Sequence, residues 1–180
     1  MVYNEELIIE RLHNPKTCQQ AFGEVIRHYT QPLYWHIRKM VIDHDDTNDV
    51  LQNTFIKAWT NIEYFRGEAK LSTWLYKIAI NESLTFISKR RQDVVGIDDE
   101  TEEFLINNLE SDEYFDGDEL KLELQKAINQ LPPKQRMVFN MRYFDEMKYE
   151  DMSEVLGTSV GALKASYHQA VKKIEQYFQV

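Results

Sequence analysis

The stretch KYEDMSEVLGTSVGALKASYHQAVKKIEQYF, residues 148–178, predicts a helix-turn-helix near the end of the chain. Its first ten residues predict a short helix that ends at Gly157, because glycine suits the left-handed position after a helix. Thr158 and Ser159 predict the turn, and Ser159 is a good N-cap for a second, longer helix. Apolar residues at three- and four-residue steps predict the buried face of that second helix: Leu163, Tyr167, Ala170, Val171, Ile174 and Phe178. Other helix-turn-helix proteins place their second helix in the major groove, so this stretch indicates DNA binding.

The opposite face of the second helix is small or basic until Glu175, with Gly161, Lys164, Ala165, His168, Lys172 and Lys173. Two short helices with a tight turn are also a common packing corner without any DNA contact. The charge distribution favours DNA binding over that alternative. Residues 1–92 carry net +1, residues 93–120 carry net −12 with no basic residue, and residues 121–180 carry net +2. The overall charge of −9 therefore describes the middle segment and does not exclude nucleic-acid binding by the two ends.

The same charge profile predicts the domain organisation. Residues 93–119 are acidic, contain Gly96 and Gly117, and show little helical periodicity, so they are expected to form a flexible acidic linker. The flanking segments 1–92 and 120–180 are each long enough for a small helical domain. The prediction is an all-α protein of two helical domains. A single cysteine, Cys18, excludes an internal disulfide, and no apolar run reaches membrane-spanning length, so a soluble, cytoplasmic protein without membrane insertion is expected.

The N-terminal segment predicts two amphipathic helices separated by a loop. Residues 46–59 predict a helix that Asp46 or Thr47 begins. Its inward face is expected to hold Val50 or Leu51, Phe55, Ala58, Trp59 and Ile62, and its wet face Asp49, Gln52, Asn53 and Lys57. Residues 64–70 predict a loop, and residues 71–92 a long helix that is apolar on most sides. Aromatic rings interleaved with basic groups favour single-stranded nucleic acid, because rings stack on unpaired bases while cations follow the backbone. Phe55, Trp59 and Trp74 are more simply read as core, which leaves Phe65, Arg66 and Lys70 as the better candidates.

Three motifs in sequence resemble one family. They are Asp49-x-x-Gln52-x-x-Phe55-x-x-x-Trp59, the run 65–81 (FRGEAKLSTWLYKIAIN), and LPPKQR at residues 131–136 followed by the helix-turn-helix. Together they resemble the extracytoplasmic-function (ECF) class of bacterial RNA polymerase sigma factors, over nearly the whole chain. The resemblance implies a region-two domain at residues 1–92 and a region-four domain at residues 120–180. It also implies core RNA polymerase, promoter DNA and an anti-sigma factor as partners, with no cofactor.

The resemblance also implies roles for individual residues. The helix 46–59 would dock on the polymerase through Asp49, Gln52 and Asn53, supported by Phe55. The loop with Phe65, Arg66 and Lys70 would capture a base flipped out of the minus-ten element. Contacts to the non-template strand and the upstream duplex would come from the following helix, through Tyr76, Lys77, Asn81, Lys89, Arg90 and Arg91. The minus-thirty-five element would be read by the helix that starts at Ser159, through Lys164, Ala165, Ser166, His168 and Gln169, while Arg136 anchors a phosphate.

Two positions depart from the family pattern. Ser166 and Gln169 stand where many members have arginine, which changes phosphate contacts or base preference. Two other functions remain open: a stand-alone helix-turn-helix regulator, and a decoy that occupies an anti-sigma factor. Catalysis is not expected, because the chain has no phosphate-binding glycine loop and no spaced carboxylate or Cys/His set. The acidic residues at 43–49 lack the glycine and the final glutamate of a calcium loop, so no metal site is expected.

Overall fold

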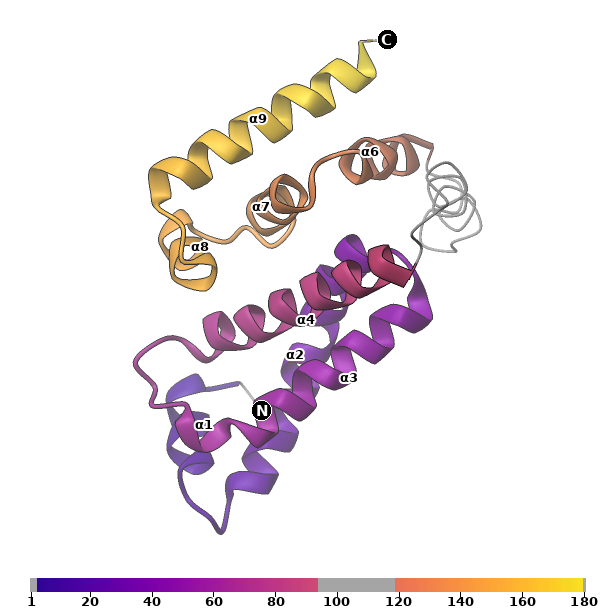
Figure 1. The fold of residues 1–180 in the computed structure, drawn as a ribbon. Helices are drawn as coiled ribbons and strands as arrows, with labels where there is room; N and C mark the ends of the chain where they lie inside the picture. The colour runs from indigo at the N-terminus through magenta and orange to yellow at the C-terminus, as the bar shows by residue number, and fades with distance from the viewer. Residues whose placement is uncertain (1–2, 94–118, 180) are drawn as a thin grey trace.

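The computed structural model describes residues 3–93 and 119–179, and within them it contains helices and no β-strand. The N-terminal part holds α1 (Glu5–Leu12), α2 (Cys18–Val41), α3 (His44–Thr60), the short 3-10 helix η1 (Ile62–Tyr64) and α4 (Leu71–Asp93). The C-terminal part holds α6 (Glu119–Asn129), α7 (Pro133–Tyr143), α8 (Tyr149–Leu156) and α9 (Val160–Phe178) (Figure 1). The all-α prediction is therefore confirmed. The predicted acidic linker falls almost entirely on residues 94–118, which lie outside the described residues.

The N-terminal helices pack around an apolar core that α2, α3 and α4 share. Leu33 and Ile37 of α2 and Leu75 of α4 are completely buried in it. Helix α3 begins at His44, two residues earlier than the sequence predicts, because Asp43 is the N-cap. The Asp43 carboxylate accepts hydrogen bonds from two free backbone amides of the first turn, at 2.9 and 3.0 Å.

The wet face predicted for α3 is confirmed, since Asp49, Gln52, Asn53 and Lys57 are all exposed. The inward face is confirmed for the residues that are buried, namely Val50, Leu51, Ala58 and Ile62. Trp59 departs from the prediction, because 43% of this residue remains exposed, although its ring contacts the Phe22 ring. Ala58, completely buried, takes the inward position at this turn of the helix.

The helix-turn-helix forms as the sequence predicts. Gly157 ends α8 with a φ of 61°, in the left-handed region where a side chain is costly. The Ser159 hydroxyl oxygen accepts a hydrogen bond from the Ala162 amide at 3.3 Å and so caps α9. Leu163, Ala170 and Ile174 are buried and Tyr167 and Val171 are half-buried, whereas Phe178, predicted to be buried, is 47% exposed at the helix end.

The two helical parts pack against each other rather than standing apart. One apolar cluster runs from α2 and α4 into the C-terminal part, where it includes Met137, Met152, Val155 and Leu163. Helix α4 lies between α3 and the C-terminal helices (Figure 1). This position explains why the α4 sequence is apolar on most sides, because the helix has packing partners on two faces.

A buried polar contact lies within this interface. His36 of α2, completely buried, donates from Nδ1 to Oδ2 of Asp145, which follows α7, at 2.6 Å. The Tyr76 ring lies edge-on to the His36 ring, and the Lys39 ammonium lies 4.4 Å from the centre of the Phe144 ring. Burial lowers the pKa of Lys39, although Asp145 acts in the opposite direction. The interface therefore combines apolar burial with a buried, directional hydrogen bond between residues 109 positions apart.

Candidate nucleic-acid and polymerase interfaces

Helix α3 presents an exposed strip on the side away from the core. Asp49, Gln52 and Asn53 share this strip, as the sequence predicts, and Phe55 is half-buried behind it. The strip continues into Ile56, which is 55% exposed and which the sequence argument did not single out. A single exposed apolar side chain is common on protein surfaces, so what links Ile56 to the strip is its place on the same face of α3 as Asp49, Gln52 and Asn53. The spacing 49-52-53-56 was visible in the sequence and could have identified Ile56.

The loop after η1 differs from the prediction in which aromatic side chain it exposes. Phe65 is only 3% exposed, and its ring packs against the Trp74 ring at a centroid distance of 5.0 Å. Tyr64, the preceding residue, is 77% exposed. The expectation that Phe65 itself offers a free ring to a base is therefore corrected. The buried Phe65 ring anchors the loop against Trp74, and the Tyr64 ring is exposed to solvent.

Tyr64 and Trp74 line two adjacent hollows. The first has a volume of about 420 Å³ and is completed by loop residues, namely Phe65, Arg66, Glu68 and Ala69. The second has a volume of about 320 Å³ and lies on the α3–α4 side, where it is completed by Lys57, Asn61, Ile78, Asn81 and Glu82. Both combine an aromatic wall with amide or charged groups, a composition that can stack on an unpaired base and form hydrogen bonds with it.

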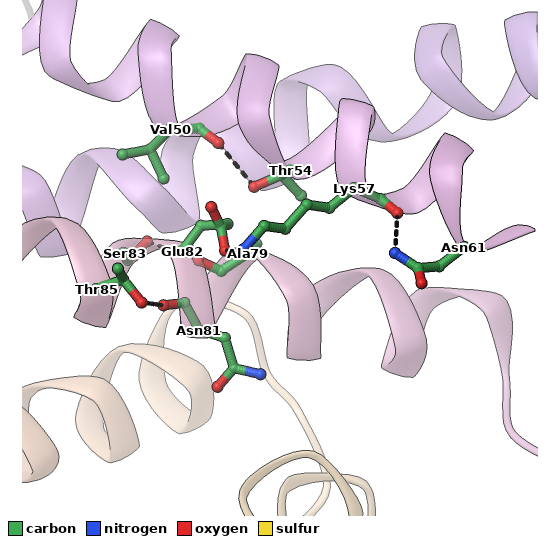
Figure 2. Close-up of polar contacts among 9 residues, drawn as sticks. All are labelled: Val50, Thr54, Lys57, Asn61, Ala79, Asn81, Glu82, Ser83 and Thr85. Carbon is green, nitrogen blue, oxygen red and sulfur yellow. Dashed lines mark hydrogen bonds and ion pairs between the residues drawn. The ribbon is translucent and has the colours of Figure 1, made fainter.

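Polar groups of α3 and α4 line one side of the second hollow, and Figure 2 shows the contacts among them. The Lys57 ammonium bonds to the Glu82 carboxylate across α3 and α4, and the Asn61 amide donates to the Lys57 carbonyl at 2.8 Å. Figure 2 shows the Asn81 side chain pointing away from α3, with its amide group free of the hydrogen bonds drawn there. Asn81 is exposed, so its donor and acceptor are available at the place where the sequence predicts a DNA contact.

The other predicted DNA contacts on the loop and α4 fall into two groups. Lys77 and Lys89 are exposed. Lys70 and Arg90, in contrast, are engaged in ion pairs, with Asp151 at 3.3 Å and with Asp46 at 2.7 Å respectively. The side chain of Arg91 lies outside the described part of the chain.

Tyr76 is 9% exposed and faces the interface beside His36, so it is not available to DNA in this arrangement. Burial raises the pKa of the Tyr76 phenol, and the nearby Asp145 carboxylate adds to the effect. Tyr76 is thus part of the interface between the two helical parts rather than of an open surface.

Burial also raises the pKa of Asp46, although the Arg90 guanidinium acts in the opposite direction.

Helix α9 exposes most of the residues predicted to read duplex DNA. Lys164, Ala165, His168 and Gln169 are exposed and Ser166 is half-buried. The Gln135 amide of α7 donates to the Gln169 side-chain oxygen at 3.1 Å, which fixes the direction of the Gln169 amide.

Arg136, predicted to anchor a phosphate, is instead used inside the domain. Its guanidinium donates to the carbonyl of Asn129 and, at 3.5 Å, to that of Leu131. Arg136 therefore holds the end of α6 against α7, and its contribution is to the fold of this part of the chain.

A groove of about 860 Å³ runs between part of α4 and the C-terminal helices, beside the place where they pack together. One wall comes from α4, including Asn81 and Ser88, and the other from the C-terminal helices, including Lys134 and Ser166. Residues predicted to contact two different stretches of DNA therefore face the same groove.

Comparison with known proteins agrees with this geometry. Residues 25–92 match the family described as Sigma-70 region 2, and residues 121–174 match Sigma-70, region 4. The RNA polymerase sigma factor SigV of Bacillus subtilis (strain 168) is 30% identical over 157 residues, which cover 87% of this chain and 90% of SigV. The ECF RNA polymerase sigma factor SigW of the same organism is also 30% identical, over 92% of this chain and 93% of SigW. The chain belongs to the ECF class of RNA polymerase sigma factors.

Solved structures share the fold of this sigma factor. RpoE, solved in complex with the anti-sigma factor NepR from Bartonella quintana, superposes with a TM-score of 0.71 at 24% identity, over 88% of this chain and 97% of that one. CnrH, solved in complex with the cytosolic domain of CnrY, gives a TM-score of 0.70 at 19% identity over 97% of both chains. As a sigma factor, the protein directs transcription initiation and is not an enzyme. None of the helices in the described part of the chain has the length and apolar character needed to cross a membrane.

Proposed function

We propose that this sigma factor binds core RNA polymerase through the exposed strip of α3 and captures an extruded promoter base beside Tyr64 and Trp74. The carrying observation is the pair of adjacent aromatic-walled hollows, one of which reaches α3 at Lys57, the residue after Ile56 of the strip. Extruding a base costs a few kcal/mol of stacking, and a pocket that stacks on the base offsets that cost without ATP. The exposed face of α9, with Lys164, His168 and Gln169, would read the minus-thirty-five element in the major groove.

The first experiment is transcription from a library of genomic promoters with core bacterial RNA polymerase, with and without the chain. Asp49→Arg reverses a charge in the α3 strip, and Glu154→Arg makes the same change at an exposed position of α8. Initiation that requires the chain, fails with Asp49→Arg and survives Glu154→Arg is the expected result. A different result would favour a stand-alone regulator: transcription at the same level with and without the chain, together with tight, sequence-specific binding of duplex DNA by the free protein.

Binding both promoter elements requires the two helical parts to separate. The minus-ten and minus-thirty-five elements lie about 25 base pairs apart, or about 85 Å of duplex at about 3.4 Å per pair. In the closed arrangement, Asn81 and Ser166 line one groove, and Lys70 is paired with Asp151 across the same interface. We infer that the free chain is closed and that promoter binding selects an open form, so the closed form lowers the apparent affinity for DNA.

Energy transfer between two dyes tests this opening. Dyes on Gln31→Cys of α2 and Gln176→Cys of α9, both exposed positions, report the separation in a Cys18→Ser background. Asp145→Arg places a cation opposite His36 and Lys39 and should lower the transfer efficiency, whereas Glu154→Arg should leave it unchanged. Equal efficiency in the two variants would show that the Asp145 contact does not hold the chain closed.

We also propose an anti-sigma partner and a cytoplasmic location, where RNA polymerase works. The support is that two structures with the same fold were solved with such partners or with a partner's cytosolic domain. In gel filtration of an extract from uninduced cells, the protein should then elute at a mass above its own 21.5 kDa. Elution at that mass under all growth conditions would contradict a constitutive partner.

A further inference from the structure

Helix α1 makes contacts with the loop between Phe65 and Leu71 at both ends of that loop. His13, which ends α1, has Nε2 at 2.8 Å from the Phe65 carbonyl oxygen. Glu5, at the start of α1, accepts a hydrogen bond through Oε1 from the Leu71 backbone amide at 3.0 Å. One eight-residue helix therefore holds the residue where the loop begins and the residue where α4 begins.

The His13 ring is itself fixed in place. Its Nδ1 lies 2.8 Å from the Ile9 carbonyl oxygen, one turn back in α1. Both ring nitrogens thus face carbonyl oxygens, which only accept, so a ring nitrogen that carries hydrogen donates to the carbonyl it faces. The Phe65 carbonyl is consequently tied to the body of α1.

The Glu5 contact acts at the other end of the loop. The first amides of a helix have no partner within the helix, and the N-terminus carries a partial positive charge. The Glu5 carboxylate satisfies one of these amides in α4, and its second oxygen accepts from the Tyr29 hydroxyl at 3.2 Å. Glu5 is therefore held by α2 while it caps α4.

Between these two ends the loop passes close to α1. Gly67 adopts a φ of 72°, and a Cβ built on it would make an ordinary van der Waals contact with the Ile9 side chain, at 3.5 Å. The same loop supplies Arg66, Glu68 and Ala69 to the hollow that Tyr64 and Trp74 line. The position of α1 thus determines the position of one wall of that hollow.

We propose that α1 is a brace for the loop 65–70, with His13 as its positioning residue, and that this brace sets how well the hollow accepts an extruded base. The proposal rests on the function proposed above for that hollow. The match to Sigma-70 region 2 begins at residue 25 and does not include α1. His13 acts through the Phe65 carbonyl and does not itself touch the base.

The test compares His13→Ala and His13→Gln with Lys16→Ala, which removes an exposed side chain from the turn that follows α1. The first readout is hydrogen exchange of the free chain. His13→Ala should raise exchange of the amides at the two ends of the loop, Phe65 and Leu71, which donate to Ile62 and Glu5, about tenfold while leaving those of α3 unchanged. His13→Gln keeps an amide donor and should restore most of the protection, and Lys16→Ala should match the wild type.

The second readout uses holoenzyme and a promoter obtained from the library, labelled with 2-aminopurine in the minus-ten element. His13→Ala should slow melting about tenfold and leave the affinity for core polymerase within about twofold, because the α3 strip is untouched. Unchanged exchange in the loop would overturn the brace, as would equal losses of melting and polymerase affinity, or no restoration by glutamine. If wild-type holoenzyme melts no promoter, the proposed function fails with the role given to the loop, while the exchange result still shows whether His13 holds it.

Discussion

Tyr64 and Phe65 are neighbours in the chain, yet the structure predicts opposite consequences for their removal. Tyr64→Ala should slow promoter melting and leave folding intact, because the ring is 77% exposed and an exposed substitution usually changes stability by less than about 0.5 kcal/mol. Phe65→Ala should destabilise the fold by about 3–5 kcal/mol, because a ring that is only 3% exposed leaves a cavity beneath the Trp74 ring.

The functional magnitude for Tyr64 comes from stacking on a single base. A base–aromatic stack is worth about 1–3 kcal/mol, which corresponds to roughly a 5- to 150-fold loss of the melted complex. Tyr64→Phe keeps the flat ring and should retain most of the activity, so it separates stacking from the phenolic hydroxyl. Urea unfolding followed by circular dichroism gives the stability, and stopped-flow fluorescence of promoter DNA in the holoenzyme gives the melting rate.

Two outcomes would refute this reasoning. If Tyr64→Ala melts promoter DNA as fast as the wild type, the exposed ring does not hold a base. If Phe65→Ala unfolds at the same urea concentration as the wild type but no longer melts promoter DNA, then Phe65 is the ring that contacts the base. The loop must then rearrange to expose it.

Three further changes test the α3 strip, the helix-turn-helix and the buried phenols. Ile56→Glu should weaken the affinity for core polymerase by roughly tenfold without loss of stability, since the side chain is 55% exposed; unchanged affinity in a fluorescence titration would remove Ile56 from the interface. Ser159→Ala removes the cap of α9 and should cost about 0.5–2 kcal/mol, measurable by urea denaturation. Burial raises the pKa of Tyr29 and Tyr76, so above pH 10 the unfolded chain loses phenolic protons that the folded chain keeps. The free energy of unfolding should therefore fall as the pH rises through and beyond 10, and a flat profile between about pH 9 and 11 would contradict that burial.

The helix-turn-helix could be predicted from sequence almost residue by residue, because its signals are local. Gly157 and Ser159 act within one turn of the helices they end and begin, and the buried face of α9 follows the helical period. The fold class and the wet face of α3 follow from the same kind of pattern. The helical period placed Phe178 on the buried face as well, but this residue lies in the last turn of α9 and is 47% exposed.

The remaining features depend on contacts that no local pattern contains. Periodicity does not apply in a loop, so it could not distinguish Tyr64 from Phe65. Arg136 donates hydrogen bonds to the Asn129 and Leu131 carbonyls because of the way α6 packs beside α7, which the local sequence does not show. The pairing of His36 with Asp145, and with it the burial of Tyr76, joins residues from the two ends of the chain. Such choices are made by tertiary packing, which a single sequence does not reveal.

The apolar cluster that joins α4 to the C-terminal helices has a thermal consequence. Hydrophobic burial weakens on cooling, because the hydration of apolar groups carries a large heat capacity. Separation of the two parts divides this cluster and exposes part of its apolar surface to water, and this exposure becomes less unfavourable in the cold. The closed form should therefore loosen as the temperature falls, and the dye pair on residues 31 and 176 would record it as a decline in energy transfer on cooling.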